Sequence, residues 1–414
     1  MSANFGAHSH YNKANIMAIS SKKLIPQHIE LLITLAGMTM FMAMCTDMYL
    51  PGFPLVAQAL HVHIVDLQLT FTSFTLGVGV GQLFYGPISD RFGRKNPAIF
   101  GLLLFIVSSI LCATATTLGH LVFYRFLQAL GGAAGMVISR AIVRDKLSGV
   151  EMSKMMSAMS MIFVFSPAVA PSIGTLILHF ATWPWIFLGL AIFGILVLIG
   201  ILRLDESLSP ENRSSDGIWQ SFKNYIVISK SPEYRSAGLI LAASSFGTFG
   251  FVSSSAAVMM GSYGVSRANY GYLFAMLAMS LVLSNHFNLK YLGRFGVIGM
   301  LRIFTTVQTV SGLFVLIASL LHGPLWTILL PVLICFACAP GIGANSMTLG
   351  MHRFPEMSGS ASAMLGLVQM LGVSVVTALF AALHFDVVSK MGWAMFAGTF
   401  VALVQTRRIK YKIE

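Results

Sequence analysis

Residues 30–54 read ELLITLAGMTMFMAMCTDMYLPGFP, and this stretch decides the fold class. The hydrocarbon core of a bilayer, about 30 Å thick, needs about 20 consecutive apolar residues in a helix. Residues 31–50 supply such a run, and it contains one carboxylate, Asp47. The other thirteen acids fall at segment ends, in loops or in the tail. Because a carboxylate inside a spanning helix is costly and rare, Asp47 is expected to have a function.

The composition of the rest of the chain extends this prediction to the whole protein. Of 414 residues, 56% are hydrophobic and only 10% are charged, whereas about a quarter of the residues of a soluble domain are charged. The chain is therefore expected to be an all-α polytopic membrane protein. Twelve transmembrane helices are predicted, near residues 29–50, 67–89, 97–117, 120–143, 153–178, 183–202, 236–261, 269–290, 297–321, 324–350, 357–384 and 388–406.

Basic residues predict how these helices are oriented. Of the 26 Lys and Arg residues, all but Arg125, Arg267 and Lys390 fall on one face when the spans alternate. By the positive-inside rule, this face and both termini are cytoplasmic, in what is expected to be a bacterial inner membrane. The net charge of +12 is thus a topology signal, and no nucleic-acid partner is expected.

The chain divides into two similar halves. Arg91-Phe92-Gly93 recurs as Arg294-Phe295-Gly296, about half the chain length later and at the same place in the order of spans. Two six-helix bundles with parallel topology are typical of rocker-switch transporters, whose site lies between the halves. The predicted parts are a cytoplasmic tail at 1–28, a first bundle at 29–202, a cytoplasmic linker with an interfacial helix at 203–235, a second bundle at 236–406 and a basic cytoplasmic tail at 407–414.

A second charge lies inside a predicted span. Arg125 is about five residues from the outer end of its helix, and Asp47 is about three residues from the outer end of the first. Opposite charges at one depth in an apolar bundle are expected to form an ion pair, or a near-pair bridged by water. The alternative is that Arg125 extends to the outer interface. Gly131, Gly132 and Gly135 on the same helix predict a packing seam.

Two further segments are candidates for conformational change. GPISDRFGRK, residues 86–95, is expected to form a tight cytoplasmic turn in which glycines permit positive φ and Asp90 pairs with Arg91 or Arg94. Two prolines in the span 153–178 are expected to bend the helix. The alternative for residues 86–95 is a charged turn that serves topology alone. The alternative for the two prolines is that a membrane helix tolerates them without a function. The candidate gating residues are Gly86, Asp90, Arg91, Gly93, Arg94, Pro167, Pro171 and Gly174.

Aromatic and flexible side chains near the predicted midplane are candidates for an adaptable substrate cavity, although they could equally face lipid. They are Tyr49, Phe41, Met44, Phe74, Phe246 and Met370. The second half has no acid within its spans, so proton chemistry is expected in the first half. Neither the CxxC at 335–338 nor the HxH at 61–63 has further ligands nearby, so no metal is expected. No nucleophile–base set is evident, so an enzyme is not expected.

Six segments together resemble a known family. They are TDMYLPGFP (46–54), GQLFYGPISDRFGRK (81–95), RFLQALGGAAGMVISRAIVRD (125–145), SPAVAPSIGTLIL (166–178), NYGYLFAMLAMSLVLSNHFN (269–288) and FPEMSGSASAMLGLVQMLG (354–372). With them, residues 30–405 resemble the major facilitator superfamily, specifically the drug:proton antiporters of the bicyclomycin/chloramphenicol resistance (Bcr/CflA) type. The resemblance implies that Asp47 is the proton-binding carboxylate and that Arg125 is the basic residue of the fourth-helix motif.

The chain departs from that pattern at three places. Thr175 replaces the second glycine of the proline motif, Trp183 is followed by proline instead of arginine, and Thr39 stands where some relatives carry a second acid. These departures bear on substrate preference and on the number of protons per cycle.

The expected function is proton-coupled multidrug efflux of small amphipathic or neutral compounds by alternating access. Its partners are a small-molecule substrate, protons and the lipid bilayer, its energy source is the proton gradient without a cofactor, and a monomer is expected. The alternatives are a dedicated exporter of a metabolite or siderophore on the same scaffold, and a membrane sensor that does not transport.

Overall fold

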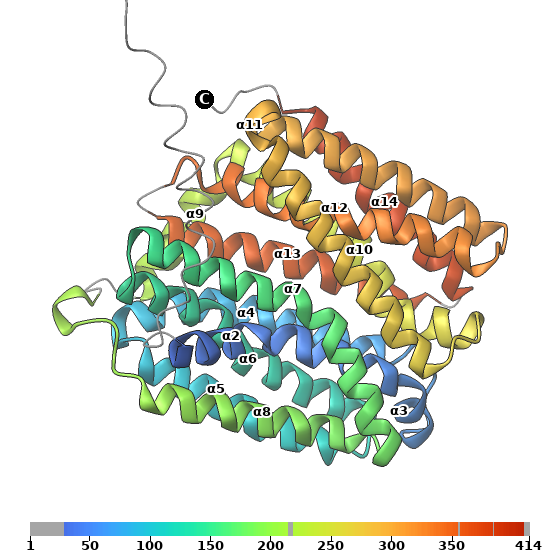
Figure 1. Ribbon diagram of the computed structural model, residues 1–414, viewed down its shortest axis with the longest axis horizontal. Helices are drawn as coiled ribbons and strands as arrows, with labels where there is room; N and C mark the ends of the chain where they lie inside the picture. Colours follow the sequence, from blue (N-terminus) through green and yellow to red (C-terminus); the bar gives the residue numbers. More distant parts are fainter. Residues whose placement is uncertain (1–28, 214–217, 355–356, 384, 410–414) are drawn as a thin grey trace, which may run out of the picture.

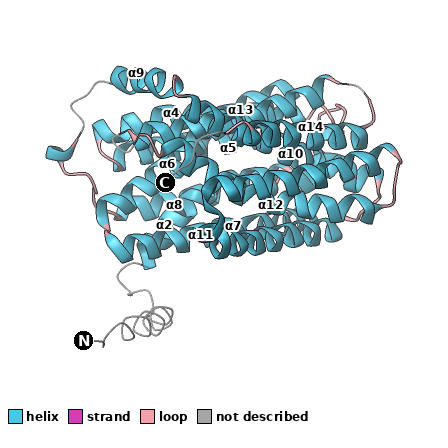
Figure 2. Ribbon diagram, turned by 90° about the horizontal axis from the view of Figure 1, so that it is seen from above, coloured by secondary structure: helices cyan, strands magenta, loops and turns pink. Residues whose placement is uncertain are grey.

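A computed structural model describes residues 29–213, 218–354, 357–383 and 385–409 (Figure 1). Within these ranges every regular element is a helix, and Figure 2 shows only helices and loops there. The predicted tail at 1–28 and residues 410–414 of the predicted basic tail lie outside the described residues.

The helices follow the predicted spans closely. In the first half they are α2 (Ile29–Asp47), η2 (Leu50–Gly52), α3 (Phe53–Ala59), α4 (Gln68–Phe92), α5 (Lys95–Ala113), α6 (Leu118–Lys146), α7 (Gly149–Phe180) and α8 (Pro184–Arg203). The connecting segment contains η3 (Pro210–Asn212) and α9 (Ile218–Ser229). The second half contains α10 (Pro232–Ala256), the π-helical turn η4 (Ala257–Ser262), α11 (Arg267–Leu320), α12 (Leu325–Met351), α13 (Ser358–Ala382) and α14 (Val387–Arg407).

Ten helical stretches in the described ranges are long and apolar enough to cross a membrane. One of them, α11, is 54 residues long and contains two of the predicted spans, joined at Gly296. The remaining predicted span is α4, a helix of 25 residues rich in Gly, Ser, Thr and Gln. All twelve predicted spans are therefore present as helices.

The helices form two groups that meet along a boundary. Figure 1 shows the first half, blue to green, below the second half, yellow to red. Helix α4 packs on α13 and α7 packs on α11 across this boundary. We call the end of the bundle with the turns at 93–94, 147–148 and 352–354 the basic end. The opposite end, with α3 and η4, is the far end (left and right in Figure 1).

The internal repeat is visible in the backbone. Gly93 ends α4 with φ 86° and ψ 171°, and Gly296 breaks α11 with φ 65° and ψ 175°. In both turns the preceding arginine lies over its neighbouring phenylalanine ring, at 5.5 Å for Arg91 and 5.4 Å for Arg294. Only glycine adopts this backbone conformation readily, so the same local solution occurs in both halves.

The turn predicted at 86–95 is shorter than expected. Helix α4 continues through Gly86 and Pro87 to Phe92, so that part of the prediction was wrong, and the position of a Cβ on Gly86 has no atom within 4 Å. Pro87 cannot donate a hydrogen bond to the carbonyl of Leu83. The hydroxyl of Tyr225 on α9 donates to that carbonyl instead, at 3.0 Å. The linker helix thus compensates for a proline inside α4.

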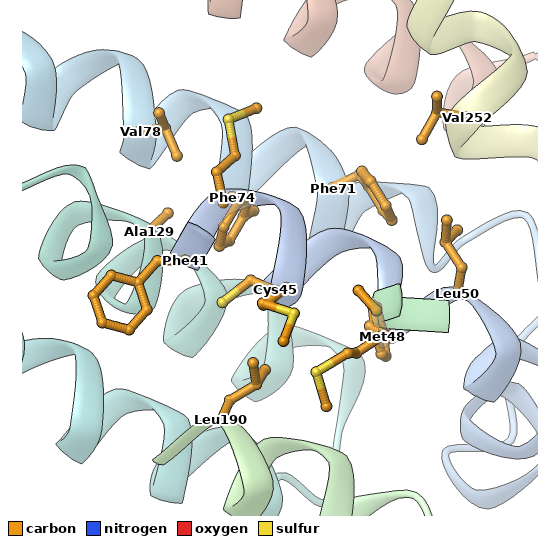
Figure 3. Close-up of a cluster of buried hydrophobic side chains, with 14 of the residues drawn as sticks. Phe41, Cys45, Met48, Leu50, Phe71, Phe74, Val78, Ala129, Leu190 and Val252 are labelled. Carbon is orange, nitrogen blue, oxygen red and sulfur yellow. The ribbon is translucent and has the colours of Figure 1, made fainter. Parts of the chain in front are cut away.

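The hydrophobic core shows where the halves are joined. One continuous cluster contains Leu50 and Phe71 from the first half together with Val252 and Tyr270 from the second, and Figure 3 shows Leu50 and Val252 within it. A second cluster, which includes Ile228 of α9 and Met300 of α11, contains residues of α9 and the second half but none of the first half. The apolar contact between the halves is therefore concentrated at the far end.

Candidate functional site

Asp47 is the last residue of α2, where the helix gives way to η2 and α3. Its exposed fraction is 6%, and it is the only carboxylate among the buried residues of the described chain. Its one hydrogen bond there is from the hydroxyl of Thr46, at 3.0 Å. Because η2 and α3 follow and extend the segment to Ala59, Asp47 lies farther from its outer end than the three residues that the sequence predicts.

Arg125 is fully buried at 0% exposure in α6. The carbon atom of its guanidinium group lies 4.1 Å from the ring centre of Phe74 and 5.2 Å from that of Tyr49. One nitrogen donates to Oε1 of Gln128 at 2.6 Å, and Gln128 in turn donates to Ser109 of α5 at 2.8 Å. Aromatic faces and one amide thus stabilise this cation, so the alternative in which it extends to the interface is wrong.

The predicted ion pair between Asp47 and Arg125 is absent from this conformation, since no contact between them within 4.0 Å occurs in the described chain. Helix geometry explains the difference. Cys45 and Tyr49 both lie beside Arg125, and Asp47, between them in sequence, is rotated about 200° from Cys45 at about 100° per residue. Asp47 therefore lies on another side of the chain from the residues that contact Arg125.

A cavity of about 410 Å³ separates the two halves at the basic end. It is lined by Gln82, Met136, Val137, Arg140, Arg144, Met156, Met347, Met351, Ser358, Gly359, Ser362, Ala363, Gly366, Gln369 and Met370. A smaller cavity of about 140 Å³ shares Met136, Arg140 and Met156 with it and reaches Thr39 on α2. The arrangement is closed at the far end and open at the basic end.

Of the six side chains predicted to line the cavity, only Met370 does so here. Phe41, Tyr49 and Phe74 are fully buried in the packing of the first half, two of them against Arg125. Met44 and Phe246 are not among the lining residues of either cavity. The sequence could not show which face of each helix points inward, because these spans are apolar all round.

Arg140 and Arg144 line the cavity, although the sequence predicted for them only a place among the cytoplasmic charges. Their spacing of four residues was the available signal, because it places both on one helix face. Gln82 and Gln369, the two amides of the cavity wall, were likewise not predicted to line it.

The predicted gating residues at the basic end form a charged cluster. Asp90 pairs with Arg94, one of the two predicted partners, while Arg91 lies over Phe92. Arg94 also donates to Asp145 of α6 at 2.8 Å. The sequence did not predict that contact or the role of Glu206, which accepts hydrogen bonds from the backbone nitrogens of Arg94 and Lys95, at 2.8 and 3.1 Å.

Glu206 is anchored as an anion in this cluster. Burial raises the pKa of its carboxyl group, but backbone hydrogen bonds from Leu208, Arg94 and Lys95 outweigh burial and hold that pKa below its usual value. The first residues of α5 thus have a carboxylate at their unpaired amides, where a helix favours negative charge.

The predicted proline segment lies within one continuous helix. Helix α7 runs through Pro167 and Pro171, and the hydroxyl of Ser166 donates at 2.7 Å to the carbonyl of Phe163 that Pro167 leaves free. At Gly174, a Cβ would collide with the carbonyl of Met48, in the turn that follows α2. This glycine allows α7 to pack closely beside the segment that carries Asp47.

Comparisons with known proteins agree with the fold. Residues 35–377 match the family model described as Major Facilitator Superfamily. A bicyclomycin resistance protein homolog of Haemophilus influenzae is 31% identical over 376 residues, which cover 90% of this chain and 94% of the relative. The multidrug resistance protein MdtL of Klebsiella pneumoniae is 29% identical over 378 residues, 86% of this chain and 90% of the relative. The crystal structure of a D-xylose-proton symporter has a TM-score of 0.73 at 16% identity, covers 92% and 96% of the two chains, and shows a common fold alone.

Proposed function

The chain belongs to the major facilitator superfamily, and from this premise we propose that it exports small amphipathic or neutral compounds in exchange for protons. The names of relatives that match over most of their length, one for bicyclomycin resistance and one for multidrug resistance, support multidrug efflux. The cavity between the halves has the mixture of methionine, amide and hydroxyl side chains that suits varied cargo.

The observation that carries proton coupling is the environment of Asp47. An ionised carboxylate buried with a single hydroxyl donor costs several kcal/mol, so the protonated acid fits the conformation that is closed at the far end. Asp47 lies eight residues beyond Thr39, about 12 Å along the helix axis at about 1.5 Å per residue, and is separated from the cavity. When the far end opens, Asp47 would take up a proton there and cargo would leave. When the basic end opens, the proton would leave towards that side as cargo enters.

In this proposal the basic end is cytoplasmic, because the positive-inside rule places the Lys- and Arg-rich loops there. The transporter then resides in the inner membrane with both termini inside, works as a monomer and needs no cofactor apart from the proton gradient. Cargo enters the cavity from the cytoplasm while the far end is closed.

The driving force is sufficient for one proton per cycle. A proton that crosses about 100 mV contributes about 2.3 kcal/mol, and a difference of one pH unit adds about 1.4 kcal/mol. Together, roughly 3.7 kcal/mol supports a gradient of about 500-fold for a neutral solute. A monovalent cation exchanged for one proton uses only the pH contribution, so neutral cargo is concentrated more strongly than cationic cargo.

The test is uptake of candidate drugs into inverted vesicles under an imposed pH gradient, with wild type and Asp47→Asn. The variant keeps the shape of the side chain but cannot carry a proton as a carboxyl group, so gradient-driven uptake is expected to fall to background. Asp66→Asn is the matched control, because Asp66 lies in a loop at the far end and only accepts a hydrogen bond from the backbone of His63. Equal uptake by wild type and Asp47→Asn would show that the proton site is elsewhere.

A further inference from the structure

Two arginines lie on the cavity-facing side of α6. Arg140 and Arg144 are four residues apart, so their side chains share one helix face, and both line the cavity between the halves. Arg140 is six residues before the end of α6 at Lys146, which places it about 9 Å inside the basic end at about 1.5 Å per residue. Arg140 therefore lies within the bundle and Arg144 nearer its rim, with both side chains exposed to the cavity side.

Neither arginine is neutralised in the described chain. Among the described residues, no carboxylate lies within 4.0 Å of Arg140 or Arg144, whereas Arg94 nearby has both Asp90 and Asp145. No Asp or Glu of the described part of the chain lines either cavity. Like charges one turn apart on a helix are unfavourable, and a cleft with apolar walls concentrates the field of such charges on whatever enters it.

An amide also lines the cavity wall. The side-chain nitrogen of Gln82 donates to the sulfur of Met136 at 3.8 Å, and its side-chain oxygen is buried against Gly366. The remaining wall is apolar and flexible, with the methionines Met136, Met156, Met347, Met351 and Met370.

We propose that Arg140 and Arg144 form an anion-binding site in this cavity and that the preferred cargo consists of amphipathic monoanions with a carboxylate or sulfonate group. This inference rests on the proposed export function and narrows its substrate class. Guanidinium groups bind such oxyanions with two parallel hydrogen bonds. The apolar part of the cargo lies against the methionines. Cations are repelled from the same cavity.

The first experiment measures the charge preference of the cavity without transport. Ser362 lines the cavity, and the native cysteines Cys45, Cys112, Cys335 and Cys338 are all buried. The Ser362→Cys chain is placed in nanodiscs of phosphatidylcholine, so that no anionic lipid competes for the arginines. It is then treated with an anionic reagent, sulfonatoethyl methanethiosulfonate, or a cationic one, trimethylammonioethyl methanethiosulfonate.

The rate with the anionic reagent is divided by the rate with the cationic reagent, and the result is normalised to the same ratio for a small thiol in solution. This normalised ratio is expected to be about 10. Combining Ser362→Cys with Arg140→Gln and Arg144→Gln is expected to return the ratio to about 1, and Arg140→Lys is expected to retain most of it. Lys146→Gln is the matched control, since it removes one exposed positive charge from the same helix outside the cavity. A ratio of 1 or below before the arginines are changed, a ratio insensitive to them, or no reaction with either reagent would overturn the proposal.

The second experiment connects the site to cargo. Uptake of 4-butylbenzenesulfonate and of neutral 4-butylbenzenesulfonamide is measured in inverted vesicles under a pH gradient. Uptake of the sulfonate is expected to exceed that of the sulfonamide, and Arg140→Gln is expected to lower the first about tenfold and the second little. Uptake that does not distinguish the two compounds contradicts the cargo assignment. If neither moves while the thiol ratio holds, the export function fails and the anion site remains.

Discussion

At the scale of single residues, Arg125 shows how a cation is kept inside an apolar bundle without a carboxylate. Three aromatic rings surround its planar guanidinium group, from Tyr49 in the turn after α2, Phe74 on α4 and Phe187 on α8. A desolvated cation over ring faces gains about 2 kcal/mol or more. Its charge therefore also joins α4, α8 and the turn after α2 to α6, which is a structural role.

Replacing Arg125 with lysine tests that role. Lysine keeps the charge but has neither the planar group that stacks on rings nor the reach to hold Gln128 in the same geometry. Arg125→Lys is expected to lower the free energy of unfolding by about 2 kcal/mol, measured as a lower Tm of the detergent-solubilised protein. Arg203→Lys is the control, because that side chain is 70% exposed and its contact with Glu30 is long, at 3.9 Å. An unchanged Tm for Arg125→Lys would mean that the rings contribute no stability.

At the scale of elements, the two related turns differ in what surrounds them. A Cβ on Gly93 would collide with the carboxylate of Glu206, whereas a Cβ on Gly296 meets no atom within 4 Å. Both glycines have the same unusual backbone conformation. The first-half turn is thus braced by the segment that follows α8, and the second-half turn is not.

The matched pair Gly93→Ala and Gly296→Ala separates backbone strain from that brace. Each alanine is strained at positive φ by about 1–3 kcal/mol. Gly93→Ala must in addition displace Glu206 from the backbone nitrogens of Arg94 and Lys95, so it is expected to lower Tm more than Gly296→Ala. Thermal unfolding of the two variants beside wild type gives the comparison. Equal decreases in Tm would contradict a stabilising role of the Glu206 contact at the first-half turn.

The Glu206 contact also predicts a pH dependence. Because the folded-state pKa of Glu206 is below its usual value of 4.5, its stabilisation is complete above that value and is lost as pH falls through the lower folded pKa. The difference in Tm between wild type and Glu206→Gln is therefore expected to be constant near neutral pH and to shrink in acid. Glu211→Gln, an exposed position in the same loop, is expected to leave the profile unchanged. A difference in Tm that grows in acid would contradict the prediction that ionised Glu206 stabilises the fold.

At the scale of the whole molecule, the boundary between the halves is held by polar contacts as well as by apolar packing. The hydroxyl of Thr72 on α4 donates to that of Thr377 on α13 at 2.7 Å, and Thr75 and Ser374 are 2.8 Å apart. These contacts lie towards the far end, which is closed. Alternating access requires them to separate when the far end opens.

A cross-link between Thr72→Cys and Thr377→Cys is expected to stop that separation. With side-chain atoms already 2.7 Å apart, oxidation is expected to form a disulfide and to reduce transport into inverted vesicles to background. A reductant is expected to restore transport, and Thr72→Cys alone is expected to be insensitive to oxidation because the native cysteines are buried. Full transport with the cross-link formed would rule out rocking at this boundary.

The sequence by itself determined the fold class, the twelve spans, the repeated turn and the one buried acid. Apolar length and the positions of charged residues are properties of the chain alone, because a bilayer accepts few other arrangements of such a sequence. The same reasoning identified Gly93, whose backbone conformation excludes most other residues.

Only the tertiary structure decided which side chains meet. It left Asp47 out of ion-pair contact with Arg125, enclosed Phe41, Tyr49 and Phe74 in the first-half core, and brought Arg140 and Arg144 into the cavity. The physical reason is that a membrane helix is apolar on the face that meets lipid and on the face that meets protein. Its sequence therefore lacks the amphipathic signal that would give its rotation, and packing against neighbouring helices supplies that information.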